Sequence, residues 1–209
     1  MLIKHSRCLP HRLHIAVSAM IKKCTGIATE EGALNPDSRI TTAIGLQITT
    51  HSQALAQDPW AKLQYIGNEV RLSQLKRHNF KRMIARANQR RSATAEAHLR
   101  RQGLNLASAD ASLPPELRPL PDLILYRQVV NRWGSGLMML GRGLYLREVS
   151  HANLYLFFLL IFIFQPVDIY SQLYLDPKYH ISQLEWEVLQ DIYDILEVRI
   201  LFVTLEDIY

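Results

Sequence analysis

Residues 58–102, DPWAKLQYIGNEVRLSQLKRHNFKRMIARANQRRSATAEAHLRRQ, contain the pattern that decides the fold class. Asp58 can accept hydrogen bonds from the free backbone N–H groups of a helix start, and Pro59 fits the first turn because no donor is needed there. Apolar residues follow at roughly helical spacing, namely Leu63, Ile66, Val70, Phe80 and Ile84. The stretch therefore predicts a helical region with one buried side.

The polar side of this region is strongly basic. Between Arg71 and Arg101 the chain has ten Lys or Arg residues and a single acid, Glu96. Such a run forms either a solvated helix face or a surface that follows a phosphate backbone, and nothing in it selects a base sequence. The candidate DNA-contacting residues on this side are Lys76, Arg77, Lys81, Arg82 and Arg86.

Two segments follow the basic region. Residues 103–122 contain four prolines with Gly, Ser, Asn and Asp, which is typical of a linker. Residues 123–148 start with a short apolar run, pass through Arg132 and Trp133 and predict a helix. An Arg beside a Trp can hold a phosphate while the ring stacks on a base, whereas most tryptophans are part of a core. The apolar positions of this helix are Leu137, Met138, Leu140, Leu144 and Leu146.

Residues 166–198 predict an acidic amphipathic helix. Ser182-Gln183-Leu184-Glu185 is a capping-box pattern and marks a helix start. The apolar stripe of this helix consists of Leu184, Val188, Leu189, Ile192, Ile195 and Leu196. Its other side is expected to be acidic and carries Glu185, Glu187, Asp191, Asp194 and Glu197. Residues 26–57, in contrast, are weakly periodic and poorly defined, and we assign no structure to them.

The N-terminal residues 1–25 combine a Cys-x-x-His segment with a short helical pattern. Cys8 and His11 are metal-ligand types at finger-like spacing, but a zinc site needs four ligands, or three and a water, and the sequence has no second tight pair. A buried Cys and a His at a helix start are the alternative. The segment lacks the apolar run of a secretory signal, and two cysteines are too few for a disulfide framework.

The composition allows a packed core and a polyanionic partner. Hydrophobic residues make up 48% of the 209 residues, and the formal net charge is +5. The sequence has no phosphate loop, no G-x-S-x-G and no H-E-x-x-H motif, and no carboxylate follows a predicted buried strand. We therefore expect a mainly α protein that has no cofactor of its own.

Three segments, in this order, resemble those of the hAT family of DNA transposases. Residues 7–22, RCLPHRLHIAVSAMIK, resemble its Cys-x-x-His segment, and residues 129–148, VVNRWGSGLMMLGRGLYLRE, resemble its Arg-Trp segment. Residues 181–198, ISQLEWEVLQDIYDILEV, are similar to the helix that follows. Two positions depart from the family pattern, since Gln128 stands where the family often has Asp and Asn131 where it has Thr.

The resemblance implies a split RNase H-like transposase of which this chain covers only a piece, including part of the helical insertion domain. The family cuts DNA with three acidic residues and Mg²⁺, and the chain is expected to lack that acidic triad, the N-terminal zinc finger and the C-terminal dimerisation region. The resemblance also implies a nuclear location. Arg132 and Trp133 match the family residues near the cleaved strand, where the Trp stabilises an extruded base.

Residues 149–165 do not resemble the family. Within them LYLFFLLIFIF is shorter than the about 20 apolar residues of a bilayer span. Codons for Val149-Ser150 and for Phe164-Gln165 can match a splice donor and a splice acceptor, so we interpret the stretch as a translated intron, with a buried helix as the alternative. Residues 199–209 are interpreted as a spurious tail.

Three functions follow from these patterns. The first is a non-catalytic transposase fragment with at most nonspecific DNA binding. The second is a host-adopted DNA-binding or protein-interaction module derived from a transposase. The third is a small membrane-associated protein anchored by residues 154–164. The short length of this apolar run argues against the third function.

Overall fold

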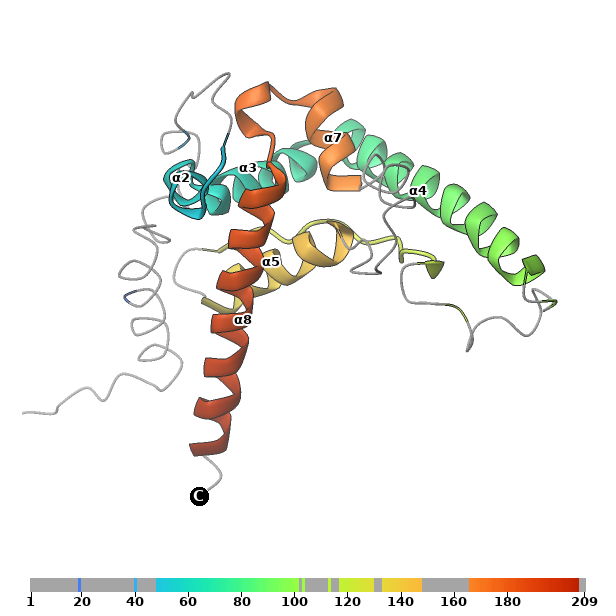
Figure 1. The fold of residues 1–209 in the computed structure, drawn as a ribbon. Coiled ribbons are helices and arrows are strands. Elements are labelled where there is room, and N and C mark those ends of the chain that lie inside the picture. Colours follow the sequence, from blue (N-terminus) through green and yellow to red (C-terminus); the bar gives the residue numbers. More distant parts are fainter. Residues whose placement is uncertain are drawn as a thin grey trace, which may run out of the picture.

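The computed structural model describes residues 19, 40, 48–101, 103, 113, 117–129, 133–147 and 166–206, with only the backbone at Trp133 and from Val198 onward. Within these ranges the chain forms helices and no strand, so the mainly α prediction is confirmed (Figure 1). The helices are α2 (His51–Ala56), α3 (Pro59–Leu72), α4 (Gln74–Arg101), α5 (Trp133–Arg147), α7 (Pro166–Tyr174), the 3-10 helix η5 (Pro177–Tyr179) and α8 (Gln183–Glu206).

Helix α3 lies at the centre of the packing. It contacts α4, α5, α8 and η5, while α7 packs against α4 and α5. Figure 1 shows that the N-terminal end of α4 lies beside the other helices, while its C-terminal end projects away from them. The α4 residues that belong to the main hydrophobic core are Phe80, Met83, Ile84 and Ala87, and Ala95 and Leu99 are also buried nearer its C-terminal end. This geometry gives α4 one long side that faces away from the core.

Helix α5 packs closely on α3 because it has glycines at the contact. A Cβ added to Gly136 would lie 2.9 Å from the Trp60 ring, and one added to Gly143 would lie 2.8 Å from a methyl of Leu63. Both distances are shorter than side chains tolerate. The seven-residue spacing of the two glycines keeps them on the same side of α5. Replacing either with a larger residue would therefore require the facing Trp60 or Leu63 side chain, or the helices themselves, to shift.

The predicted start of the helical region is confirmed. Asp58 Oδ1 accepts a hydrogen bond of 2.9 Å from the backbone N–H of Ala61, and Pro59 occupies the first helical position. The five predicted apolar positions are all buried. The region nevertheless forms two helices, because Ser73 is extended and its hydroxyl accepts a hydrogen bond from the Lys76 N–H at the start of α4.

Residues 51–56 form α2, within the weakly periodic region 26–57 to which no structure was assigned from the sequence. Thr50 accepts a hydrogen bond from the backbone of Gln53, and the Gln53 side chain accepts one from the backbone of Thr50. This reciprocal pair is a capping box, which the Thr-x-x-Gln spacing could have revealed. The helix has only six residues, too few for a periodic apolar pattern.

The C-terminal prediction holds at its capping box and fails in three details. The box forms, since Glu185 Oε2 accepts from Ser182 N at 2.7 Å and Ser182 Oγ accepts from Glu185 N at 3.3 Å. Residues 166–198 are not one helix, because α7, η5 and the start of α8 share them. Glu185 is fully buried rather than on the acidic side, whereas Ile195 of the apolar stripe is 46% exposed.

Two further differences concern helix positions and ends. Met138 of the predicted α5 stripe is half exposed, and its neighbour Met139 is buried in its place. Helix α8 continues to Glu206 and so passes the boundary predicted at residue 199. Among the described residues, no helix is long and apolar enough to cross a membrane. The apolar run at residues 154–164 lies outside the described residues.

Candidate nucleic-acid interface on helix α4

The end of the predicted linker and the chain that follows it are fixed along α3 and α4. The Asn88 side chain accepts from Leu120 N and donates to Leu120 O, both at 2.7 Å. Arg71 Nε donates to Leu125 O at 2.6 Å, and Trp60 Nε1 donates to Gln128 Oε1 at 2.9 Å. These bonds anchor residues 120–128, part of which was predicted to be a linker.

The exposed side of α4 carries three arginines spaced by four residues, Arg82, Arg86 and Arg90, which we call the arginine ridge. All three are exposed. An α-helix rises 1.5 Å per residue, so the side chains leave the helix at intervals of about 6 Å. Within the described part of the chain, Arg82 and Arg86 have no hydrogen bond or ion pair. Like charges at this spacing repel each other, and a bound polyanion removes that repulsion.

The other basic candidates on α4 are partly neutralised. Lys76 is half-buried and forms an ion pair with Glu69 of α3. The Arg77 guanidinium bonds to the backbone carbonyl of Ser73 at 3.5 Å. Lys81 Nζ lies 2.7 Å from Asp122 Oδ2. Of the five α4 residues predicted from the sequence, only Arg82 and Arg86 are both exposed and unpaired among the described residues.

Sequence reasoning omitted Arg90 from the candidate residues. The i, i+4, i+8 spacing of Arg82, Arg86 and Arg90 is visible in the sequence and could have selected it. The basic run alone does not separate ridge positions from positions that turn toward the body of the protein. That separation depends on which side of α4 packs against α3 and α7.

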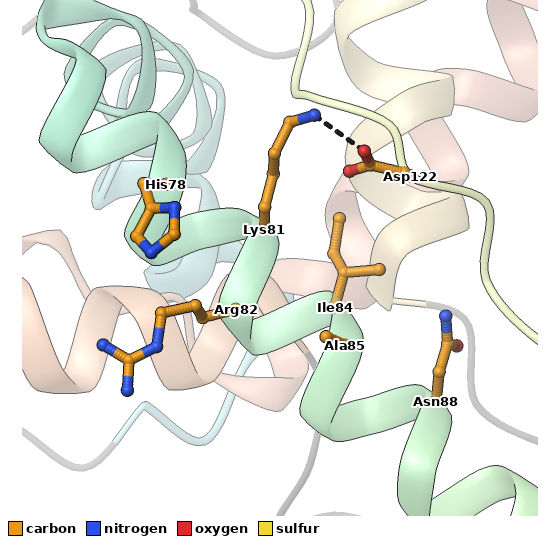
Figure 2. Close-up of a pocket in the computed structure, with 7 residues that line it drawn as sticks. All are labelled: His78, Lys81, Arg82, Ile84, Ala85, Asn88 and Asp122. Carbon is orange, nitrogen blue, oxygen red and sulfur yellow. Dashed lines mark hydrogen bonds and ion pairs between the residues drawn. The ribbon is translucent and has the colours of Figure 1, made fainter.

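A shallow hollow lies beside the arginine ridge, and we call it the α4 hollow. Its volume is about 330 Å³. Figure 2 shows the Lys81 side chain reaching to Asp122, while Arg82 extends in another direction. Basic, amide and carboxylate side chains line the hollow together with the apolar residues Ile84 and Ala85. The hollow is lined by His78, Lys81, Arg82, Ile84, Ala85, Asn88 and Asp122.

The remaining site predictions fall largely outside the described residues. Arg132, Cys8 and His11 are among the residues that the structure does not describe. Trp133 is the first residue of α5, and its side chain is not described. Gln128, which departs from the family pattern, accepts the Trp60 indole hydrogen bond and so has a structural partner. Within the described ranges no group of three metal-ligating side chains comes together.

Two buried polar clusters join helices elsewhere in the fold. Lys62 Nζ of α3 lies 2.5 Å from Glu185 Oε1 of α8 and donates to the carbonyl of His180 at 3.0 Å. In the second cluster, Trp186 Nε1 donates to Asp168 Oδ1 at 3.0 Å. The Arg147 guanidinium lies over the Trp186 ring at 4.9 Å. Each of these groups has a partner in the fold, so both clusters serve a structural role.

The second cluster makes stability depend on pH. Burial raises the pKa of the Asp168 carboxyl from 3.8 to about 6, against the lowering effects of the Trp186 hydrogen bond and the Arg147 charge. The folded chain thus binds this proton more tightly than the unfolded chain. The contribution of Asp168 to the free energy of unfolding is highest below about pH 4 and falls as the pH rises to about 6.

We expect Asp168→Asn to remove this dependence, because Asn imitates the protonated carboxyl. Relative to the parent chain, the free energy of unfolding of the variant should rise by about 2–3 kcal/mol between pH 4 and pH 7.5. Urea unfolding at both pH values measures the difference. The matched control is Asp191→Asn, which alters an exposed carboxylate of α8. Parallel pH profiles for the parent chain and Asp168→Asn would contradict the assignment.

Comparisons with family models, with curated proteins and with solved structures found no match to this chain. The functional proposal therefore depends on the geometry of α4.

Proposed function

We propose that this chain binds the phosphate backbone of nucleic acid through α4, without reading the base sequence and without cleaving the strand. The observation that carries the proposal is the arginine ridge, in which Arg82 and Arg86 are exposed and have no partner within the described residues. Exposed guanidinium groups displace condensed counterions from phosphates, which is the main source of nonspecific binding.

The shape of α4 supports the same proposal. The helix has 28 residues and projects from the body of the fold (Figure 1), so a duplex or a single strand can approach its exposed side. Ten basic residues and one acid between Arg71 and Arg101 give this part of the chain a strong positive charge. Helix α4 contains no recognised motif for reading base edges in a DNA groove, so the expected binding depends on charge.

The resemblance to hAT transposases indicates which kind of protein this DNA-binding helix would belong to. We propose that the chain corresponds to part of the helical insertion domain of such a transposase, acts in the nucleus and lacks the acidic triad of the parent enzymes. A non-catalytic fragment and a host-adopted DNA-binding or protein-interaction module both fit an α4 that binds phosphates. Reading the genomic frame beyond both ends of the chain separates them, because a decayed element would retain acidic codons there.

The test compares two arginines that differ in position. Arg86→Ala should weaken binding to a 20-base-pair duplex about threefold to tenfold at 0.1 M salt and reduce the slope of log K against log salt by about 0.9. Arg127→Ala is the control, because Arg127 is exposed but lies on the segment after the linker. It removes the same charge from another surface and should change binding less than twofold. Fluorescence anisotropy over a salt series measures both quantities.

The same experiment tests the two other parts of the proposal. Duplexes of unrelated sequence should bind the parent chain equally well, and incubation with magnesium should leave every strand intact. Equal losses for Arg86→Ala and Arg127→Ala would show that net charge, rather than α4, determines binding. Absence of binding at low salt would refute the proposed function altogether.

A further inference from the structure

One cation beside the arginine ridge already has an anionic partner from the protein itself. Lys81 of α4 pairs with Asp122, which lies 41 residues later in the chain. Their side chains are 45% and 64% exposed, so the pair lies at the surface, where an external anion can reach it. Figure 2 shows this pair at the α4 hollow, on a different side from the end of Arg82.

The position of Asp122 is fixed by its neighbours in the chain. Two residues before it, Leu120 is held by both polar groups of the Asn88 side chain. Three residues after it, the Leu125 carbonyl is held by Arg71. Asp122 therefore stays above α4 even when its carboxylate loses its ion pair, and its charge remains close to the hollow.

The Lys81–Asp122 pair is weak enough to exchange. Exposed Lys–carboxylate pairs stabilise proteins by about 0.2–1 kcal/mol and weaken with salt. A phosphate oxygen accepts the same charge-assisted hydrogen bonds from an ammonium group as a carboxylate does. A phosphate in a polymer has a further advantage, because neighbouring phosphates can engage Arg82 and Arg86 at the same time.

We propose that the α4 hollow is a subsite for one backbone phosphate of a nucleic acid, and that this phosphate replaces the Asp122 carboxylate on Lys81. Lys81 then supplies a third cation next to Arg82 and Arg86. Asn88 lines the hollow but its amide is committed to Leu120, so it contributes shape rather than a hydrogen bond. Asp122 acts as an internal competitor that lowers affinity. The inference rests on the proposed function and adds a regulated subsite to it.

Asp122→Asn tests the subsite directly. The substitution removes the competing charge, so binding to a 20-base-pair duplex should tighten about fivefold to tenfold at 0.1 M salt, and the salt slope should steepen by about 0.9. Asp191→Asn is the matched control, because it makes the same charge change on the exposed face of α8. It should tighten binding less than twofold. Thermal unfolding of each variant checks that the fold is retained.

Lys81→Ala adds a test of position. In the parent chain it should weaken binding at least threefold, because it removes the cation of the subsite and leaves the Asp122 carboxylate unpaired beside the phosphate. In the Asp122→Asn background it should abolish the gain. Equal tightening by Asp122→Asn and Asp191→Asn, or a gain that survives Lys81→Ala, would overturn the subsite while leaving binding by the arginine ridge intact. Failure of every chain to bind duplex at low salt would instead refute the proposed function.

Discussion

Lys62→Met should lower the free energy of unfolding by about 3–5 kcal/mol, which is the largest effect that we expect from a single substitution. The Lys62 and Glu185 side chains are only 6% and 1% exposed, and Nζ lies 2.5 Å from Oε1. Removing the ammonium group leaves the Glu185 carboxylate buried with an uncompensated charge. An isolated charge in a protein interior costs several kcal/mol.

A second substitution should recover much of this loss. Lys62→Met with Glu185→Gln has no buried charge, and the Gln oxygen can still accept from Ser182 N as Glu185 does. Lys81→Met is the matched control, since it removes the lysine of an exposed pair with Asp122 and should cost less than about 1 kcal/mol. Urea unfolding followed by circular dichroism gives all three values. A loss below 1 kcal/mol for Lys62→Met would contradict the buried pair.

Reversing the charge of two ridge residues should weaken duplex binding on the order of a hundredfold at 0.1 M salt. Arg82→Glu with Arg86→Glu removes two phosphate contacts, which lowers the salt slope by about 1.8. The new carboxylates also repel the phosphates. Helix stability should change little, because the pair at i, i+4 exchanges one like-charge repulsion for another. Fluorescence anisotropy at several salt concentrations measures both the loss of duplex affinity and the change in the salt slope.

The control for this variant has the same change in net charge. Arg127→Glu with Lys178→Glu reverses two basic residues that lie on the segment after the linker and on η5. If α4 is the interface, this control should lose less than tenfold. Comparable losses in the two double variants would mean that the whole positive surface attracts the polymer, and would remove the arginine ridge from the proposal.

Local patterns predicted most of the helical structure. The start of α3 follows from Asp58 and Pro59, and the start of α8 follows from the capping box at Ser182, because each signal acts within one turn. The buried positions of α3 and α4 followed from helical spacing. The missed helix α2 also had a local signal, the Thr50–Gln53 box, but it is too short for periodicity.

Errors arose where one helix face meets several partners. Met138 and Ile195 satisfy helical spacing, yet they are exposed, because the contacts of α5 with α3 and α7 and those of α8 with α2 and α5 select other positions. Spacing fixes which residues share a face but does not fix where the neighbouring helix ends. The same limit applied to the candidate site, where Lys76 and Lys81 share the basic run with Arg82 but have acidic partners.

The sequence by itself determined that the described chain is helical, where two of its helices begin and that its basic residues gather in one region. These features depend on residues within a few positions of one another. Only the tertiary structure decided that Glu185 is buried against Lys62, 123 residues away, and that Asp122 neutralises Lys81, 41 residues away. Whether a charged side chain is neutralised or left exposed depends on the residues that pack beside it. Helical periodicity contains no information about partners so distant in the chain.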